Sequence, residues 1–398
     1  MTPELTRRIW FTLGALLVFR LGTFIPLPGI EPSVWEQIFR SQSGGILGTL
    51  NTISGGGIHR LAIFALGLVP YVSAAVLIQL LPIISKRLRA LRTQGERGRR
   101  KIDLYTLVLT AVLAILQAYG VAIGLEGVGG GLVADPGWLF RTTTVLTLTG
   151  GVMALVWLSE WITARGLGNG VTLILFVGFV AEVPAGIAGM LELGRQGVLS
   201  SGMILALLGS AIALTALVVA VERGRRRLPV QAAGRERDPP ASLSFKVNNA
   251  GIIPAVLASW VLLLPTAIVF LVAPAWQGQL QGPLVTIVYA ALIVACTFFY
   301  TAFLIDPDAA AETLKKHSAL IPGIFPGEPT AEHIDGVVTR LTVIGALYLA
   351  LLYLVPAVLV AIAPVPFYFG GASLLIVVCA ILDLEDHIRG FASVRTGV

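Results

Sequence analysis

The side chains able to carry out acid–base, redox or metal chemistry are few in this chain and lie far apart. No histidine has a metal-ligand spacing to another, and both cysteines lie inside apolar runs, where they are small core residues. The chain has no phosphate-binding GxxxxGK[ST] loop and no HExxH pair. We therefore expect no catalytic residues, no metal, no cofactor and no enzyme activity. These histidines and cysteines are His59, His317, His333, His387, Cys296 and Cys379.

Charged residues within the long apolar runs are equally scarce. They are Arg20, Glu182 and, at the boundary of a run, Glu160. An ion-coupled transporter usually keeps ionisable groups near the membrane midplane, where each is costly and is retained for function. The nearly uncharged interior favours a passive pathway, with energy supplied by a partner or by the cargo.

The elements that position these residues are membrane helices. Of the 398 residues, 56% are apolar and 13% are charged, and the mean hydropathy is +0.86. Such a chain is too apolar for a cytosolic enzyme, a disulfide scaffold or a disordered protein. About 20 apolar residues cross a bilayer as a helix. Ten windows fit this length, at Ile9–Leu27, Leu61–Ile84, Leu104–Gly124, Thr142–Trp161, Val171–Met190, Gly202–Val221, Ala250–Val272, Leu284–Ile305, Leu341–Ala361 and Phe369–Leu384.

The distribution of basic residues predicts the orientation. If the N-terminus is cytoplasmic, 23 basic residues fall on the inner side and four on the outer side, which is the bias of a membrane protein. We expect a multi-pass protein with both termini in the cytoplasm. The first run has no small-residue cleavage pattern behind it and is interpreted as a retained span. The pI of about 9.5 could also indicate nucleic-acid binding, but loop charge explains it more simply.

Ten spans divide into two halves of five, which makes the second half inverted relative to the first. We expect an N-terminal half over 1–190 and a C-terminal half over 191–398, the latter with cytoplasmic loops at 222–247 and 306–340. No residue-level repeat supports this division, so it is an architectural inference.

Three segments interrupt the helical pattern. The segment Ser43–Arg60 is too short to span, and is either a re-entrant segment or a loop with a small hydrophobic contact. Pro70 lies early in the second window and predicts a bend, either at a movable element or as an ordinary proline kink. The glycines of Gly166–Gly170 predict a tight turn with positive φ before the fifth span.

Eight blocks occur in order between Ser43 and Val378, within a stretch of similarity from about Arg7 to Leu384. They read SGGILGTLNTISGGGIHRLAIFALGLVPYVSAAVLIQLL, QGERGRRKI, ITARGLGNGVTLILF, VERGRRRLPVQ, FKVNNAGIIPAVLAS, ETLKKHSALIPGIFPGEPT, RLTVIGALYL and FYFGGASLLIVV. In this order they resemble the SecY/Sec61-alpha family, the channel-forming subunits of protein translocases. The resemblance implies an all-α membrane protein, with ten transmembrane helices in two inverted five-helix halves around an hourglass pore.

The resemblance also implies a pore. Six aliphatic side chains would form a ring at the constriction, and a plug at about 44–54 would close the outer funnel. The second and seventh spans would part as a lateral gate, so that polypeptides cross the bacterial inner membrane and membrane helices leave sideways into lipid. For any one aliphatic residue, core packing or lipid contact is the commoner role. The ring would be Leu68, Val72, Val171, Leu175, Val256 and Ile376, and the plug would include Gly45, Ile46, Leu47, Leu50 and Ile53.

The partners implied are SecE, SecG, the ATPase SecA or the ribosome, signal-sequence-bearing polypeptides and membrane lipid. Basic cytoplasmic loops suit RNA phosphates or an acidic motor surface. The same basic residues are also explained by their role in setting the orientation of the spans in the membrane. The family's PGIRPG loop has Phe325 in place of its arginine, and the tails are short, which puts motor coupling in doubt and leaves open a divergent or accessory member. The partner-binding candidates are Arg225, Arg226, Arg227, Arg235, Arg237, Lys315, Lys316 and Phe325.

Two other classes of function compete with the channel. A small-molecule secondary transporter can share the inverted architecture, but the uncharged spans and the aliphatic ring disfavour it. An interaction scaffold that has lost transport is the third.

Overall fold

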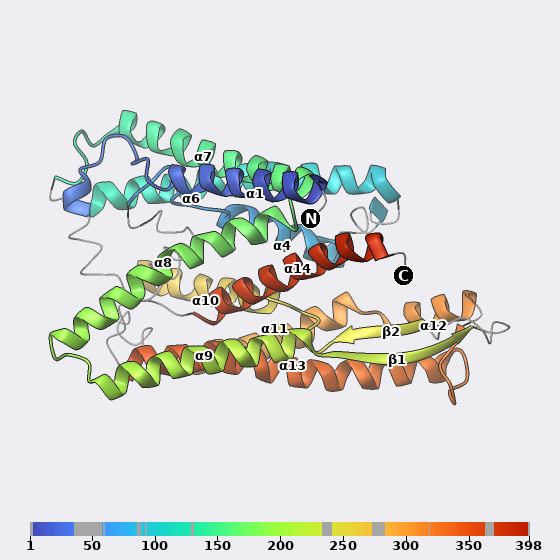
Figure 1. Cartoon of the computed structure of the whole chain (residues 1–398). Coiled ribbons are helices and arrows are strands. Elements are labelled where there is room, and N and C mark those ends of the chain that lie inside the picture. The colour runs from blue at the N-terminus through green and yellow to red at the C-terminus, as the bar shows by residue number, and fades with distance from the viewer. Residues whose placement is uncertain are drawn as a thin grey trace. The chain divides into compact units, whose positions relative to one another are not determined.

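The chain is built mainly from long helices, as a computed structural model shows (Figure 1). It describes residues 3–35, 58, 60–85, 88, 90–91, 94–128, 131–232, 241–272, 283–317, 319–362 and 370–396. The helices are α1 (Pro3–Gly22), α4 (Val69–Ile84), α6 (Gly95–Val128), α7 (Trp138–Arg165), α8 (Gly170–Arg195), α9 (Ser201–Arg223), α10 (Ile253–Val272), α11 (Pro283–Leu304), α12 (Pro307–Lys316), α13 (Glu328–Ile362) and α14 (Gly371–Thr396). The strands are β1 (Arg225–Ala232), β2 (Ala241–Lys246) and β3 (Ala319–Leu320).

Each of the ten predicted windows contains a long helix, so the helical membrane-protein class is confirmed. Within the described residues, six helices are long and apolar enough to cross a membrane by length and composition: α6, α7, α8, α9, α11 and α13. The count of ten spans agrees with these helices and stays a prediction.

The described residues form two compact units. Unit 1 comprises Met1–Leu205 and Ile376–Val398, and unit 2 comprises Ala206–Ile362 and Gly370–Leu375. The predicted division after residue 190 stays a prediction; in the structure the chain passes between the units within α9 and again within α14.

Several hydroxyl groups inside the helices donate to a carbonyl oxygen of their own helix, although those of Thr144, Thr149 and Ser373 are buried without a partner among the described residues. Thr110 donates to the carbonyl oxygen of Thr106 at 2.7 Å, and Ser159 donates to that of Val156 at 2.7 Å in unit 1. Thr297 and Thr342 do the same in unit 2. A hydroxyl bonded to its own helix leaves no unpaired polar group facing apolar surroundings, which suits helices in lipid.

The segments near Leu27 and Leu61 pair with each other, and α4 therefore begins later in the chain than expected. The Leu27 amide donates to the Leu61 carbonyl oxygen at 2.8 Å, and the Ile63 amide donates to that of Ile25 at 3.0 Å. Leu61 and Gly67 have positive φ, and successive turns fill the segment between them. The second window, expected to be helical from Leu61, is therefore helical only from Val69.

Unit 2 adds a small sheet to its helices. The strands have the order β2-β1-β3, with β1 antiparallel to both neighbours. Arg225 faces Lys246 across the hairpin, and buried Leu228 and Val230 alternate with exposed neighbours along β1. The two loops expected at 222–247 and 306–340 are thus largely structured, because they contain this sheet, α12 and the first turns of α13.

Candidate pore and partner-binding surface

Five of the six predicted ring residues lie in one hydrophobic cluster of unit 1. Leu68 and Val72 come from the start of α4, Val171 and Leu175 from the start of α8, and Ile376 from α14. Leu68 and Leu175 are buried members of the cluster, and the other three are partly buried against it. We call this cluster the pore cluster; its remaining buried members are Ala15, Phe19, Phe64, Ala114, Val152, Leu155, Val156, Ile162, Leu173 and Ile174. The sixth ring residue, Val256, is partly buried on α10 of unit 2.

The start of α4 differs from the sequence expectation. Because the helix begins at Val69, Pro70 occupies its second position, where a proline costs no helical hydrogen bond. Pro70 therefore starts the helix and does not bend it, and the proline inside α4 is Pro82. The Val72 amide donates to the Leu68 carbonyl oxygen at 2.9 Å, so these two ring positions are one helical turn apart.

The turn before α8 is packed closely against its neighbours. Gly168 has a φ of 69°, as the sequence predicted for a glycine of this turn. A Cβ on Gly170 would lie 2.0 Å from the Ser159 carbonyl oxygen, so only glycine fits there. The Asn169 side-chain oxygen accepts from the Val171 amide at 2.9 Å and caps the helix. The backbone position of Val171 is therefore fixed by this turn.

The two charged residues inside the predicted spans face each other in unit 1. Arg20 on α1 lies 4.0 Å from Glu182 on α8, and the guanidinium groups of Arg20 and Arg60 both lie over the Phe24 ring, at 4.9 and 4.3 Å. Neither charge is a member of the pore cluster. An arginine and a carboxylate this close partly offset each other's charge.

The plug residues Gly45, Ile46, Leu47, Leu50 and Ile53 lie outside the described residues, and so do Arg235 and Arg237. Their roles stay predictions.

A second apolar cluster supports the predicted partner surface in unit 2. Leu228 and Phe245 from the hairpin pack with Ile321 and with Ile334, Val338 and Leu341 of α13. We call this cluster, with the strands and α12 around it, the hairpin platform. Its outer surface is charged, with Arg225, Arg226, Arg227, Lys246, Lys315 and Lys316 all exposed. Lys316 pairs with Glu312 at 2.9 Å.

Phe325 lies in the loop between β3 and α13, next to the hairpin platform. Its side chain is 82% exposed, although it is large and apolar. The Thr330 hydroxyl donates to the Phe325 carbonyl oxygen at 2.7 Å, and Gly323 and Gly327 take positive φ on either side. The backbone is thus held in place, and the phenyl group of Phe325 is exposed to a partner or to solvent.

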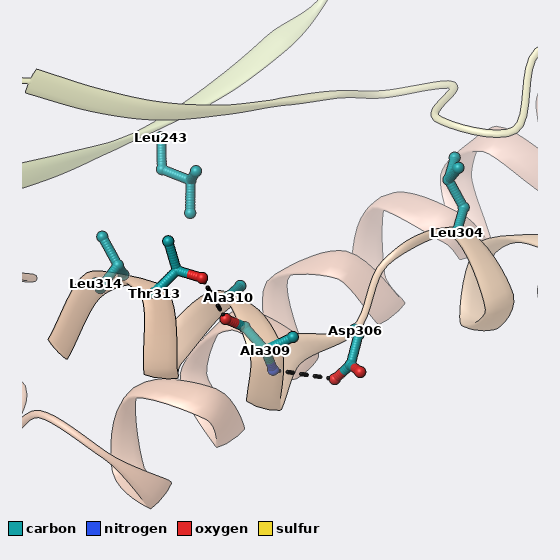
Figure 2. Close-up of a pocket in the computed structure, with 7 residues that line it drawn as sticks. All are labelled: Leu243, Leu304, Asp306, Ala309, Ala310, Thr313 and Leu314. Atoms are coloured by element: carbon teal, nitrogen blue, oxygen red, sulfur yellow. Dashed lines mark hydrogen bonds between the residues drawn. The ribbon is translucent and has the colours of Figure 1, made fainter. Parts of the chain in front are cut away.

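A pocket of about 390 Å³ opens beside α12 in the hairpin platform (Figure 2). Its polar side chains already form hydrogen bonds with the backbone of α12. The Asp306 carboxylate accepts from the Ala309 amide at 3.1 Å, and the Thr313 hydroxyl donates to the Ala309 carbonyl oxygen at 2.7 Å. What remains is an apolar wall suited to an apolar side chain. The lining residues are Leu243, Leu304, Asp306, Ala309, Ala310, Thr313 and Leu314.

A buried polar contact at the base of the hairpin was not predicted from the sequence. The Asn248 side-chain amide donates to the Glu222 carboxylate at 2.8 Å, and the Asn248 oxygen accepts from the Gly251 amide at 3.0 Å. Both side chains are buried. The NNAG text in the block FKVNNAGIIPAVLAS indicated the local turn, because asparagine and glycine both favour turns, but nothing in it indicated the contact with Glu222. Among the described residues, no group of three His, Cys, Asp or Glu side chains is placed to hold a metal ion.

Comparisons with known proteins agree with this architecture. The family model described as SecY matches residues 62–384. The chain is 45% identical to protein translocase subunit SecY of Escherichia coli (strain K12), over 97% of this chain and 91% of the relative. It is 43% identical to the Pseudomonas aeruginosa subunit of the same name, over 97% and 90%.

Solved structures share the fold. One titled "The structure of a protein conducting channel" matches with a TM-score of 0.69 at 17% identity, over 98% of this chain and 93% of the other. Canine Sec61, from a structure of the ribosome-channel complex of the endoplasmic reticulum, matches with a TM-score of 0.66 at 17% identity, over the same shares.

Proposed function

Because this chain belongs to the SecY family of protein translocase subunits, we propose that it conducts unfolded polypeptides across a membrane through a constriction of six aliphatic side chains. Channels of this kind are not catalysts, so the cargo is moved by a partner and not by chemistry in the pore. The constriction is the ring of Leu68, Val72, Val171, Leu175, Val256 and Ile376.

The observation that carries this proposal is the pore cluster. Three helices far apart in the sequence contribute five of the six ring residues to it, and all five are aliphatic. A narrow aliphatic constriction dewets, so it blocks water and ions while the channel is at rest. It also has no hydrogen-bonding group that could hold a passing chain. This combination suits cargo of any sequence.

The remaining parts of the proposed channel are those that the family resemblance implies. Val256, on the seventh span, completes the ring, and the second and seventh spans part so that a signal sequence or membrane helix enters lipid. The segment at about 44–54 closes the outer funnel. The halves 1–190 and 191–398 are inverted repeats, and the basic bias of the loops places both termini in the cytoplasm at a bacterial inner membrane.

The hairpin platform is the docking surface for the partners that drive transport. Its exposed basic residues on β1 and at the end of α12 suit RNA phosphates or acidic protein surfaces, and Arg235 and Arg237 extend that charge. The canine relative comes from a ribosome-channel complex, which supports the ribosome as one partner. SecA is the alternative motor, and SecE and SecG are the other channel subunits.

Phe325 favours a variant of this function in which motor coupling is altered. A cytoplasmic arginine can form a bidentate contact with a carboxylate or a phosphate, whereas phenylalanine offers apolar contact only. An accessory channel with its own motor fits this loop better than a typical family member does.

Reconstitution tests the proposal. The chain, purified with its native partners in proteoliposomes, is expected to protect a signal-bearing polypeptide from added protease when the motor and ATP are present. The matched control is the same polypeptide without its signal, which is expected to stay accessible. Protection of neither polypeptide, together with stabilisation of the chain by a small solute, would support the transporter and overturn the channel.

A further inference from the structure

The turn that starts α8 is held by a carboxylate from the other end of the chain. The Asn169 amide donates to Asp383 Oδ2 at 3.2 Å, although the two residues are 214 positions apart. The same oxygen lies 3.3 Å from the place that a Cβ on Gly168 would occupy, so the carboxylate is seated directly against the glycine with positive φ. Both residues belong to unit 1.

Asp383 lies on the same helix as a ring residue. Ile376 precedes it by seven positions on α14, which is two helical turns and therefore the same face. Ile376 packs against the pore cluster, as does Val171, the second residue after Asn169. The helix α14 thus contributes Ile376 to the pore cluster and, through Asp383, a hydrogen bond to the turn that starts α8.

Two other helices also hold the backbone of this turn in place by hydrogen bonds. The Leu167 amide donates to the Thr12 hydroxyl oxygen of α1 at 3.1 Å, and the Gly170 amide donates to the Thr163 hydroxyl oxygen of α7 at 2.8 Å. Together with the Asp383 contact, these bonds join α1, α7 and α14 to the turn Gly166–Gly170. A carboxylate is also favoured at this place, because the positive end of the α8 dipole faces it.

We infer that Asp383 is a positioning residue of the constriction. Its carboxylate holds α14 against the turn that starts α8, and so fixes the height of Ile376 relative to Val171 and Leu175 in the ring. This inference rests on the proposed role of the ring. Without this hydrogen bond α14 can slide or rotate against α8, and the aliphatic side chains no longer meet at one level.

The test compares Asp383→Ala and Asp383→Asn with Asp386→Ala, an exposed carboxylate three residues later on the same helix. The readouts are ion conductance of the resting channel in planar bilayers and the rate of thiol labelling at Val171→Cys. A lost charge-assisted hydrogen bond shifts an equilibrium by roughly ten- to a hundredfold, and the lower figure applies here because this contact is exposed. We expect Asp383→Ala to raise both readouts by up to about that factor, Asp383→Asn to raise them less, and Asp386→Ala to leave them unchanged.

Ile376→Asp serves as the reference for a disrupted ring. If Ile376→Asp conducts ions while Asp383→Ala stays closed with unchanged labelling, the positioning role is wrong and the ring stands. If Ile376→Asp itself stays closed, the ring assignment fails and the inference fails with it. A lowered melting temperature of Asp383→Ala without any change in either readout would also overturn the inference, since it would leave only a structural role.

Discussion

The pore cluster and the hairpin platform use apolar packing for opposite purposes. In the pore cluster the aliphatic side chains of the ring are themselves the proposed working surface. In the hairpin platform the apolar side chains lie inside, and the surface outside them carries Arg225, Lys246 and the exposed Phe325. We therefore expect the pore cluster to bind no partner and the hairpin platform to bind a specific one.

This difference gives a clear expectation. Changes in the pore cluster should alter what leaks through the resting channel, and changes in the hairpin platform should alter which partner binds. The two effects should separate experimentally.

The largest effect is expected from a charge in the ring. Val171→Asp places a carboxylate among aliphatic side chains, so water enters to solvate it, and the ion conductance of the resting channel should rise at least about tenfold. Val180→Asp is the matched control, because Val180 lies on the same helix and its side chain is 42% exposed. The glycine pair Val72→Gly with Val171→Gly should give a smaller leak. Equal currents from the Val171 and Val180 variants would remove Val171 from the constriction.

Deletion of Gly45 to Ser54 should come next in effect. If this segment closes the outer funnel, its loss leaves the ring as the remaining barrier, and single-channel recordings should show brief, flickering openings. The melting temperature should change little, because the segment lies between the predicted spans. Silent bilayers would make the plug assignment wrong.

Truncation inside the hairpin platform should destabilise unit 2 and weaken partner binding, and should leave the resting conductance unchanged. Phe245→Ala removes a buried ring and is expected to cost about 3 kcal/mol of stability in unit 2. Binding of the motor or the ribosome, measured by surface plasmon resonance, should weaken, whereas the resting conductance should stay at the wild-type level. Ser244→Ala, at the exposed neighbouring position, is the control. A raised conductance in Phe245→Ala would show that the two regions are not separable.

The smallest effect is expected at Phe325. Phe325→Arg restores a group that can make a charge-assisted hydrogen bond worth about 1.5–3 kcal/mol, which corresponds to roughly ten- to a hundredfold in affinity. Acidic residues in the predicted loop, among them Glu328 and Glu332, should repel an acidic motor surface and make this rescue partial. We therefore expect the gain in motor affinity to be about tenfold.

Phe325→Ala separates the two explanations of this loop. If the loop merely lacks its arginine, Phe325→Ala should bind the motor as wild type does. If the wild type binds more tightly than both variants, the motor of this protein has co-adapted to an apolar contact, and the weakened-docking hypothesis is wrong.

The sequence predicted the helices well because apolar periodicity and length are local properties. All ten windows contain a long helix, and the Gly168 turn was expected from its glycines alone. The late start of α4 was not predictable, because it depends on pairing of the segments near Leu27 and Leu61, which leaves no periodic pattern. The extensions of α6 and α13 were missed because charged residues at their starts resemble loops.

The site was predictable only through the family. An aliphatic residue such as Val171 looks the same in a ring, in a core or facing lipid, so composition and spacing could not single it out. The contacts of Asp383 with Asn169 and of Asn248 with Glu222 depend on tertiary structure. Polar residues that pair across such separations give no signal in a single sequence.

The central claim is that polypeptides pass through the aliphatic ring. A single cysteine at Val171, in a chain otherwise free of Cys296 and Cys379, can be tested for disulfide formation with a cysteine-bearing polypeptide trapped midway through transport. We predict a cross-link at Val171→Cys and none at Val180→Cys, with formation dependent on the motor and the signal sequence. A trapped polypeptide that cross-links equally at both positions, or at neither, would contradict the account.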